Sequence, residues 1–342
     1  MCYNPTVIVV YRSPKYEKKI VKFYKNFPYE NYGKFFNEHY KQLELISWKD
    51  KETGDLIKDY ARCIDITFVP CGNCVGCSLD HSKNWANRLK LENKYHDVGF
   101  FITLTYDDDH LPKSHNLVKE DLQKFLKSMK NFYYNNFGVC PKYFAVGEYG
   151  GKSGRPHYHL LYWADLRINN FKMDFVGSSE LGNKLFSSEL VSKFWQNGFN
   201  TVAEISDKTI AYVCRYSLKK QSRSRDEKKE LKLMHFQPEF LLCSKGLGDQ
   251  YYIDHFDEIL NNDLKIYVNS SSFATTRRFK EIAKKLGREE ELDLIVKRRN
   301  DELYSQSLNT FSLLENDETY NEYLEKCCEN KKKKLKYLKR SN

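Results

Sequence analysis

The sequence predicts an α+β fold in which a central antiparallel sheet is flanked by helices. Four segments rich in β-branched and aromatic residues read as strands, at residues 97–106, 142–148, 156–163 and 200–205. Three segments with apolar residues at helical spacing alternate with them, at residues 116–132, 187–196 and 208–220. The glycine-rich stretch 149–155 predicts a hairpin between the second and third strands. The resulting order β-α-β-β-α-β-α is typical of an antiparallel sheet with packed helices.

The helix expected after residue 116 has a candidate cap in Asn116, an amino acid that favours this position. On either side of the sheet region the chain changes character. Residues 1–92 contain a strand at 6–11, a cysteine cluster and a polar helix at 78–92, whereas residues 223–342 open with a charged linker and become helical and polar. A lysine-rich tail closes the sequence, and we expect a solvated, partly disordered arm there. We therefore predict three parts: residues 1–92, 93–222 and 223–342.

The composition is compatible with a nucleic-acid partner. The chain has 342 residues, a net charge of +10 and 15% aromatic residues. Cations bind phosphates and rings stack on bases, although charge alone fits a basic protein without such a role equally well. The apolar run at residues 7–10 is too short to cross a bilayer and the first residues lack a signal-peptide pattern. We expect a protein of the reducing cytoplasm that does not enter a membrane.

The strongest local signal is the pair His157 and His159 in the strand at 156–163. Side chains alternate along a strand, so both imidazoles share one face. If the hairpin forms, Glu148 lies beside them and adds a carboxylate. Two histidines and one carboxylate suit Mg²⁺ or Mn²⁺ bound to a phosphate oxygen. The alternative is a pair of ordinary surface histidines beside a hairpin-end charge.

Tyr212 and Tyr216 are four residues apart in the last predicted helix, so they occupy one face about one turn (~5.4 Å) apart. Arg215, Lys219 and Lys220 add positive charge that favours phenolate and DNA phosphate. Because the chain has 25 tyrosines, such a pair alone is weak evidence. Together with the metal residues it fits a phosphotyrosine transesterification. One tyrosine attacks a phosphodiester and frees a 3′-hydroxyl for a polymerase, and the second can later release a closed circle.

Three motifs resemble those of the HUH endonuclease superfamily of rolling-circle replication initiators. They are Phe-Ile-Thr-Leu-Thr-Tyr at 101–106, Pro-His-Tyr-His at 156–159, and the two-tyrosine segment 212–220. More narrowly, the sequence resembles initiators of microvirus-type (gokushovirus-like) single-stranded DNA phages, through its Met-Cys start and the segments 70–77, 147–150 and 238–242. The resemblance spans roughly residues 1–250. Arg215 departs from the lysine that such initiators often carry between the tyrosines.

This resemblance implies the HUH fold and a site-specific nicking and joining activity on phage DNA at a replication origin. It also implies divalent-metal use, catalytic roles for Tyr212 and Tyr216, and metal binding by Glu148, His157 and His159. The segment 147–153 is not a P-loop, because its glycine spacing is one residue short and it joins two strands. Strand separation is therefore assigned to a host helicase, beside a host polymerase.

Cys71, Cys74 and Cys77 predict a structural zinc knuckle, with glycines that let the backbone wrap a metal. Tetrahedral zinc needs a fourth ligand, for which Cys2 is preferred over Cys63. Three metal-free thiols and an iron–sulfur cluster are the alternatives. Two other functions also stay open. One is a non-catalytic zinc-knuckle DNA-binding protein, and the other is a plasmid initiator, relaxase or transposase with the same HUH site.

Overall fold

The computed structural model divides the chain into two compact units, residues 1–80 with 301–342 and residues 81–300, and each is treated by itself. The residues that the structure describes are 6–25, 38–39, 41–50, 52–72, 74–113, 115–150, 153–166, 172–179, 182, 184–221, 229–231, 233–268, 271–312 and 320–338.

The first unit contains a four-stranded antiparallel sheet in the order β2-β1-β4-β3. Its strands are β1 (Thr6–Arg12), β2 (Lys19–Tyr24), β3 (Leu43–Lys49) and β4 (Leu56–Val69). The predicted strand at 6–11 is confirmed as β1, whereas the other three strands were not expected. Alternate side chains of these strands, including Val7, Val9 and Ile46, form a small hydrophobic core of their own.

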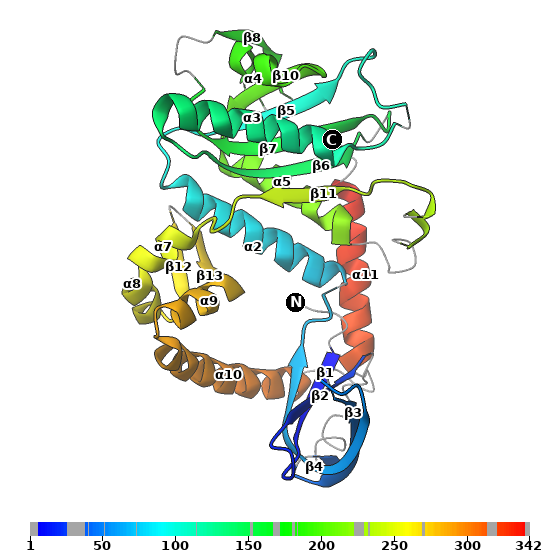
Figure 1. The fold of residues 1–342 in the computed structure, drawn as a ribbon. Helices are drawn as coiled ribbons and strands as arrows, with labels where there is room; N and C mark the ends of the chain where they lie inside the picture. Colours follow the sequence, from blue (N-terminus) through cyan, green and yellow to red (C-terminus); the bar gives the residue numbers. More distant parts are fainter. Residues whose placement is uncertain are drawn as a thin grey trace. The chain divides into compact units, whose positions relative to one another are not determined.

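The second unit is built on a seven-stranded sheet in the order β11-β6-β7-β5-β10-β9-β8, and every pair in it is antiparallel. Its strands are β5 (Phe100–Tyr106), β6 (Lys142–Tyr149), β7 (Pro156–Trp163), β8 (Met173–Ser178), β9 (Lys184–Ser188), β10 (Gly198–Glu204) and β11 (Phe240–Cys243). The expected α+β architecture is thus confirmed as a large antiparallel sheet flanked by helices (Figure 1).

Strand β5 shows why this sheet has two different faces. Phe100, Ile102 and Leu104 are buried against helices α3 (Lys119–Phe137) and α4 (Glu189–Phe194), as Figure 1 shows for α3. The alternate residues Phe101, Thr103 and Thr105 are only partly buried and lie on the opposite face. That face is covered at one end by helices α2 (Val75–Asn93) and α5 (Asp207–Gln221).

Buried side chains hold α2 and α5 on this second face. Val213 and Cys214 of α5 pack with Leu161 and Trp163 of β7 and with Leu89 of α2. Ser82 on α2 donates a hydrogen bond to the carbonyl oxygen of Cys214, at 2.9 Å. The covering ends along β7, so the part of the strand that carries His157 and His159 stays accessible from one side.

Asn116 is not the cap of α3, and that prediction is wrong. The helix begins at Lys119, and its N-cap residue is Val118, which has no side chain able to cap. The Nδ2 atom of Asn116 instead donates to the carbonyl oxygen of His235, at 3.1 Å. The first turn gains its support from β7, because the Tyr158 hydroxyl accepts from the Val118 backbone N–H and donates to its carbonyl oxygen.

The C-terminal part contains helices and one hairpin. Its elements are α7 (Asp249–Asp254), α8 (Phe256–Asn261), β12 (Lys265–Val268), β13 (Ser271–Ala274), α9 (Arg277–Lys285), α10 (Glu289–Ser312) and α11 (Tyr320–Leu338). Helical, polar sequence was expected here, whereas the β12–β13 hairpin was not. The lysine-rich stretch 331–334 is exposed as predicted, but it is helical because α11 continues to Leu338. Within the described part of the chain, no helix is long and apolar enough to cross a membrane.

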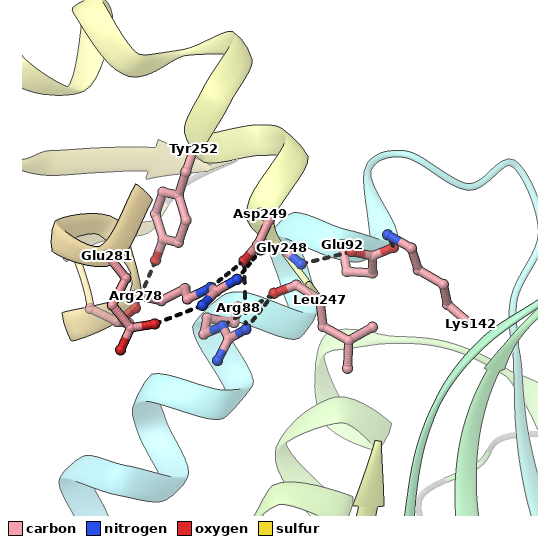
Figure 2. A network of polar contacts seen from close by, with 10 residues as sticks. Arg88, Glu92, Lys142, Leu247, Gly248, Asp249, Tyr252, Arg278 and Glu281 are labelled. Atoms are coloured by element: carbon pink, nitrogen blue, oxygen red, sulfur yellow. Dashed lines mark hydrogen bonds and ion pairs between the residues drawn. The ribbon is translucent and has the colours of Figure 1, made fainter. Parts of the chain in front are cut away.

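A buried polar network joins α2 to the segment before α7 (Figure 2). The Oε2 atom of Glu92 accepts from the backbone N–H of Gly248 at 2.7 Å, and its Oε1 atom pairs with Lys142 at 2.8 Å. Arg88 donates to the carbonyl oxygen of Leu247, and Asp249 pairs with Arg278. The network fixes α2, whose next turns cover the second face of the sheet.

Candidate functional site

The hairpin of β6 and β7 brings Glu148 next to both histidines. The register pairs Glu148 with His157 across the two strands, as the glycine-rich turn had predicted. One carboxylate oxygen, Oε1, lies 2.8 Å from Nε2 of His157 and 3.2 Å from Nε2 of His159. Glu148 and His159 are buried, and His157 is partly exposed. One ligand atom from each residue lies within 4.8 Å of the others, so the three can hold a metal ion.

The outer nitrogens of the two imidazoles are also bonded. Nδ1 of His157 lies 3.0 Å from the carbonyl oxygen of Arg155, and Nδ1 of His159 lies 2.9 Å from Oγ1 of Thr103. A carbonyl oxygen only accepts, so Nδ1 of His157 carries the proton of the neutral ring. Its Nε2 lone pair then faces the lone pairs of the Glu148 carboxylate. Only a proton or a metal cation between them makes this contact favourable, so the donor set fits a cation.

Electrostatics at Glu148 point the same way. Burial raises the pKa of its carboxyl, but hydrogen bonds from His157 and His159 outweigh burial and hold the pKa at about 2. Glu148 is therefore a carboxylate throughout the physiological pH range. A buried negative charge facing two imidazoles is the arrangement expected of a site for a hard divalent cation.

Helix α5 places Tyr212 against the same cluster. The Tyr212 ring contacts His159 edge-on with ring centroids 5.4 Å apart, and it contacts Phe101 of β5 at 5.9 Å. The guanidinium carbon of Arg215 lies 5.9 Å from the centroid of the Tyr212 ring. A phenol therefore lies beside the three ligand residues, and a cation lies beside the phenol. Tyr216 follows one helical turn later on α5.

Three of the expected site residues cannot be placed at the side-chain level. The side chains of Tyr216, Lys219 and Lys220 fall outside the described residues, although the α5 backbone is helical as far as Gln221. Conversely, the sequence had not singled out Thr103 as the partner of His159. Strand alternation puts Thr103 and Thr105 on one face, but their proximity to the histidines depends on the pairing of β5 with β7.

The cysteine cluster lies in the first unit, where β4 leads into α2. The Sγ atoms of Cys71 and Cys77 are 3.9 Å apart, and ligand atoms of Cys71, Cys74 and Cys77 all lie within 4.8 Å. The backbone N–H of Cys74 donates to Sγ of Cys71, and that of Cys77 donates to Sγ of Cys74. Gly72 adopts φ +77°, so the turn has a conformation that favours glycine. Three sulfurs around one point fit a thiolate metal site.

The fourth ligand of such a site has several candidates. Cys2 lies outside the described residues. Cys63 is fully buried in the core of the small sheet, and its Sγ donates to the carbonyl oxygen of Asp65. Cys328 of α11 is partly buried in the same unit. Burial raises the pKa of the Cys328 thiol, and the nearby thiols of Cys74 and Cys71 raise it further.

The second unit thus carries a site that can bind a divalent cation, with a tyrosine beside it, on the open part of an antiparallel sheet. Known proteins contain related sequences. The model of a family described by the name replication-associated protein ORF2 matches residues 99–221, which span β5 to α5. This stretch contains Glu148, both histidines and both tyrosines. No solved structure matches the chain.

Three curated relatives match over longer stretches. Replication-associated protein ORF2 of Spiroplasma virus 4 is 33% identical over 65% of this chain and 69% of its own length. Replication-associated protein ORF4 of Chlamydia phage 1 is 27% identical over 73% of this chain and 61% of its own. Replication-associated protein VP4 of Bdellovibrio phage phiMH2K is 28% identical over 73% and 80%. The chain belongs to this family of phage replication-associated proteins, and the resemblance to phage replication initiators is confirmed.

Proposed function

We propose that this protein is a metal-dependent tyrosine endonuclease of the HUH type that starts rolling-circle replication of a phage genome. The observation that carries the proposal is the contact between Tyr212 and a histidine whose Nε2 atom faces Glu148. A nucleophile of the right type thus stands beside a site that suits a phosphate-bound cation. Membership of the phage replication family supports a phage initiator over a plasmid initiator, relaxase or transposase.

In this proposal Glu148, His157 and His159 bind Mg²⁺ or Mn²⁺, which polarises a non-bridging oxygen of the scissile phosphate when bound. The phenolic oxygen of Tyr212 or Tyr216 attacks the phosphorus. The new bond joins tyrosine to the 5′-phosphate, and the bond to the 3′-oxygen breaks. The phenolic proton passes to solvent, and the 3′-oxygen leaves as a hydroxyl after taking a proton from solvent. Arg215 favours the phenolate of Tyr212 by its charge.

The second tyrosine then completes the cycle. Once a polymerase has copied the circle from the free 3′-hydroxyl, the other phenol attacks the regenerated junction. The freed 3′-hydroxyl attacks the first phosphotyrosine and seals the displaced strand. Each step exchanges one phosphodiester for another, so no nucleotide triphosphate is consumed. Lys219 and Lys220 hold the DNA backbone, and host helicase and polymerase act on the nicked origin in the bacterial cytoplasm.

The test is the formation of a covalent protein–DNA adduct. A labelled single-stranded oligonucleotide library is incubated with the protein and Mn²⁺, and products are separated by denaturing electrophoresis. We expect a metal-dependent adduct that persists in at least one of Tyr212→Phe and Tyr216→Phe and disappears in the double variant. Tyr134→Phe is the matched control, because this exposed tyrosine lies on α3 on the opposite face of the sheet.

The competing function is a zinc-knuckle DNA-binding protein without catalysis. We infer a structural zinc ion at Cys71, Cys74 and Cys77 in either case, with Cys2 as the preferred fourth ligand. The two functions differ in one result. Tight DNA binding without an adduct on any sequence in the library would contradict the endonuclease and favour the binding protein.

A further inference from the structure

An exposed phenylalanine lies on the same face of the sheet as the candidate metal residues. The register pairs Glu148 with His157 on β7, His157 with Thr105 on β5, and Thr105 with Phe199 on β10. Residues directly opposite one another in antiparallel strands project to the same face. The four side chains therefore form one row across four strands, and Phe199 stands at its end. Neighbouring strands are about 4.8 Å apart, so Phe199 lies roughly 10 Å from His157.

The surroundings of Phe199 leave its ring available. The side chain is 67% exposed. Its neighbours on the same face are Thr105 and Thr201, whose short side chains do not cover an aromatic ring. A single exposed apolar residue is common on protein surfaces and would carry nothing by itself. Here the exposed ring continues the row that contains two of the candidate metal ligands.

The backbone at the start of β10 fixes this ring in place. Gly198 has φ +148°, and a Cβ atom there would overlap the backbone of Thr105 and Asp107 on β5. The close approach keeps Phe199 in register with Thr105, whose hydroxyl lies 3.5 Å from the Phe199 carbonyl oxygen. The ring is thus presented from a paired strand, and little conformational freedom remains to be lost on binding.

We propose that Phe199 is a stacking platform for a base of single-stranded DNA next to the scissile phosphate. The inference rests on the proposed function, since the phosphate is assumed to bind at Glu148, His157 and His159. With a phosphate held there, a base of a nearby nucleotide reaches the row's other end. Every base has a flat apolar face, so an aromatic ring binds single strands with little dependence on sequence. Duplex DNA offers no such face, which makes the platform selective for single strands.

The test compares two strands in a metal-free buffer with a chelator, where no nicking takes place. One is oligo-dT, and the other is a strand of equal length with the same sugar-phosphate backbone but no bases. Binding of each is followed by fluorescence anisotropy for wild type, Phe199→Ala and Phe199→Trp. Phe175→Ala is the matched control: Phe175 is 61% exposed on β8. It pairs with Phe186, which pairs with Val202 on the opposite face of the sheet.

We expect Phe199→Ala to weaken oligo-dT binding roughly tenfold, the loss of one stacked base, and to leave the base-free strand unaffected. Phe199→Trp and Phe175→Ala should keep wild-type affinity for both strands. Equal losses on the two strands, or no loss on oligo-dT, would overturn the proposal. Because the assay needs neither metal nor tyrosine, absence of the covalent adduct overturns the endonuclease alone, and an unchanged Phe199→Ala overturns the platform alone.

Discussion

The Tyr212 ring stands edge-on against the His159 imidazole, with centroids 5.4 Å apart. One residue comes from a helix and the other from a strand, so their contact depends on how α5 lies on the sheet. Val213 and Cys214, the next residues of α5, are buried in a core that includes Leu161, two positions beyond His159. The hydrophobic packing that holds the helix therefore also sets the position of a candidate nucleophile relative to a candidate metal ligand.

The first prediction concerns Thr103, which bonds the outer nitrogen of His159. We expect Thr103→Val to weaken Mn²⁺ binding about 10- to 100-fold, because groups that orient a ligating histidine commonly contribute that much. Isothermal titration calorimetry measures the change directly. Thr103→Ser keeps the hydroxyl and should bind like wild type. Thr201→Val, one strand away on the same face, is the matched control. Equal affinity in Thr103→Val and wild type would show that His159 does not depend on this bond.

The second prediction concerns Gly198, where β10 approaches β5. We expect Gly198→Ala to lower the free energy of unfolding by at least about 2 kcal/mol, from backbone strain and from overlap with Thr105 and Asp107. Gly177 has the similar φ of +145° but open space around it. Gly177→Ala therefore isolates the strain and should cost less. Urea denaturation of both variants gives the difference. If both cost the same, the close approach of the two strands has no energetic consequence.

Part of this site followed from the sequence alone. Two histidines two residues apart, a glycine-rich turn and a glutamate nine residues earlier require only local pairing, and the hairpin indeed pairs Glu148 with His157. Thr103 and Phe199 depend instead on pairings between strands far apart in the chain, for which a single sequence gives no register. The wrong cap at Asn116 has the same origin, since its amide bonds a carbonyl 119 residues away.

The fold shows the same division between local and distant information. Segments with clear periodicity, such as the helix α3 and the strands β5 to β7, lie close to where they were expected. The strands β2, β3 and β4 were missed because their exposed faces mix charged and aromatic residues, such as Lys58 and Tyr60, which masks the alternation. The lysine-rich stretch was read as an arm from its charge, yet high helix propensity of Lys and Leu lets α11 continue.

The third prediction is a pH dependence that originates at Glu92. Burial raises its pKa, but hydrogen bonds from His96, Lys142 and the Gly248 backbone outweigh burial and hold it at about 2, against an ordinary value of 4.5. A depressed pKa stabilises the fold fully above pH 4.5, and this contribution is lost as the pH falls towards 2. We expect Glu92→Gln to cost about 3 kcal/mol at pH 7 and progressively less between pH 4.5 and 2.

Chemical denaturation at a series of pH values tests this dependence. Asp207→Asn is the matched control, because Asp207 pairs with Lys90 at 2.8 Å but is well exposed to solvent. It should cost less than about 1 kcal/mol. A Glu92→Gln difference that stays constant from pH 7 to 2 would mean that the network in Figure 2 does not depend on the carboxylate charge.

The last prediction concerns the three cysteines between β4 and α2. We expect the purified protein to contain about one zinc ion per chain, because three convergent thiolates and one further ligand meet the tetrahedral preference of Zn²⁺. Cys74→Ser should lose the metal and destabilise the first unit, whereas Cys140→Ser, at an exposed cysteine of the second unit, should keep it. Cys2→Ser and Cys328→Ser distinguish the candidates for the fourth ligand. Cobalt substitution adds a visible spectrum that reports the number of thiolates bound, and full zinc content in Cys74→Ser would contradict the site.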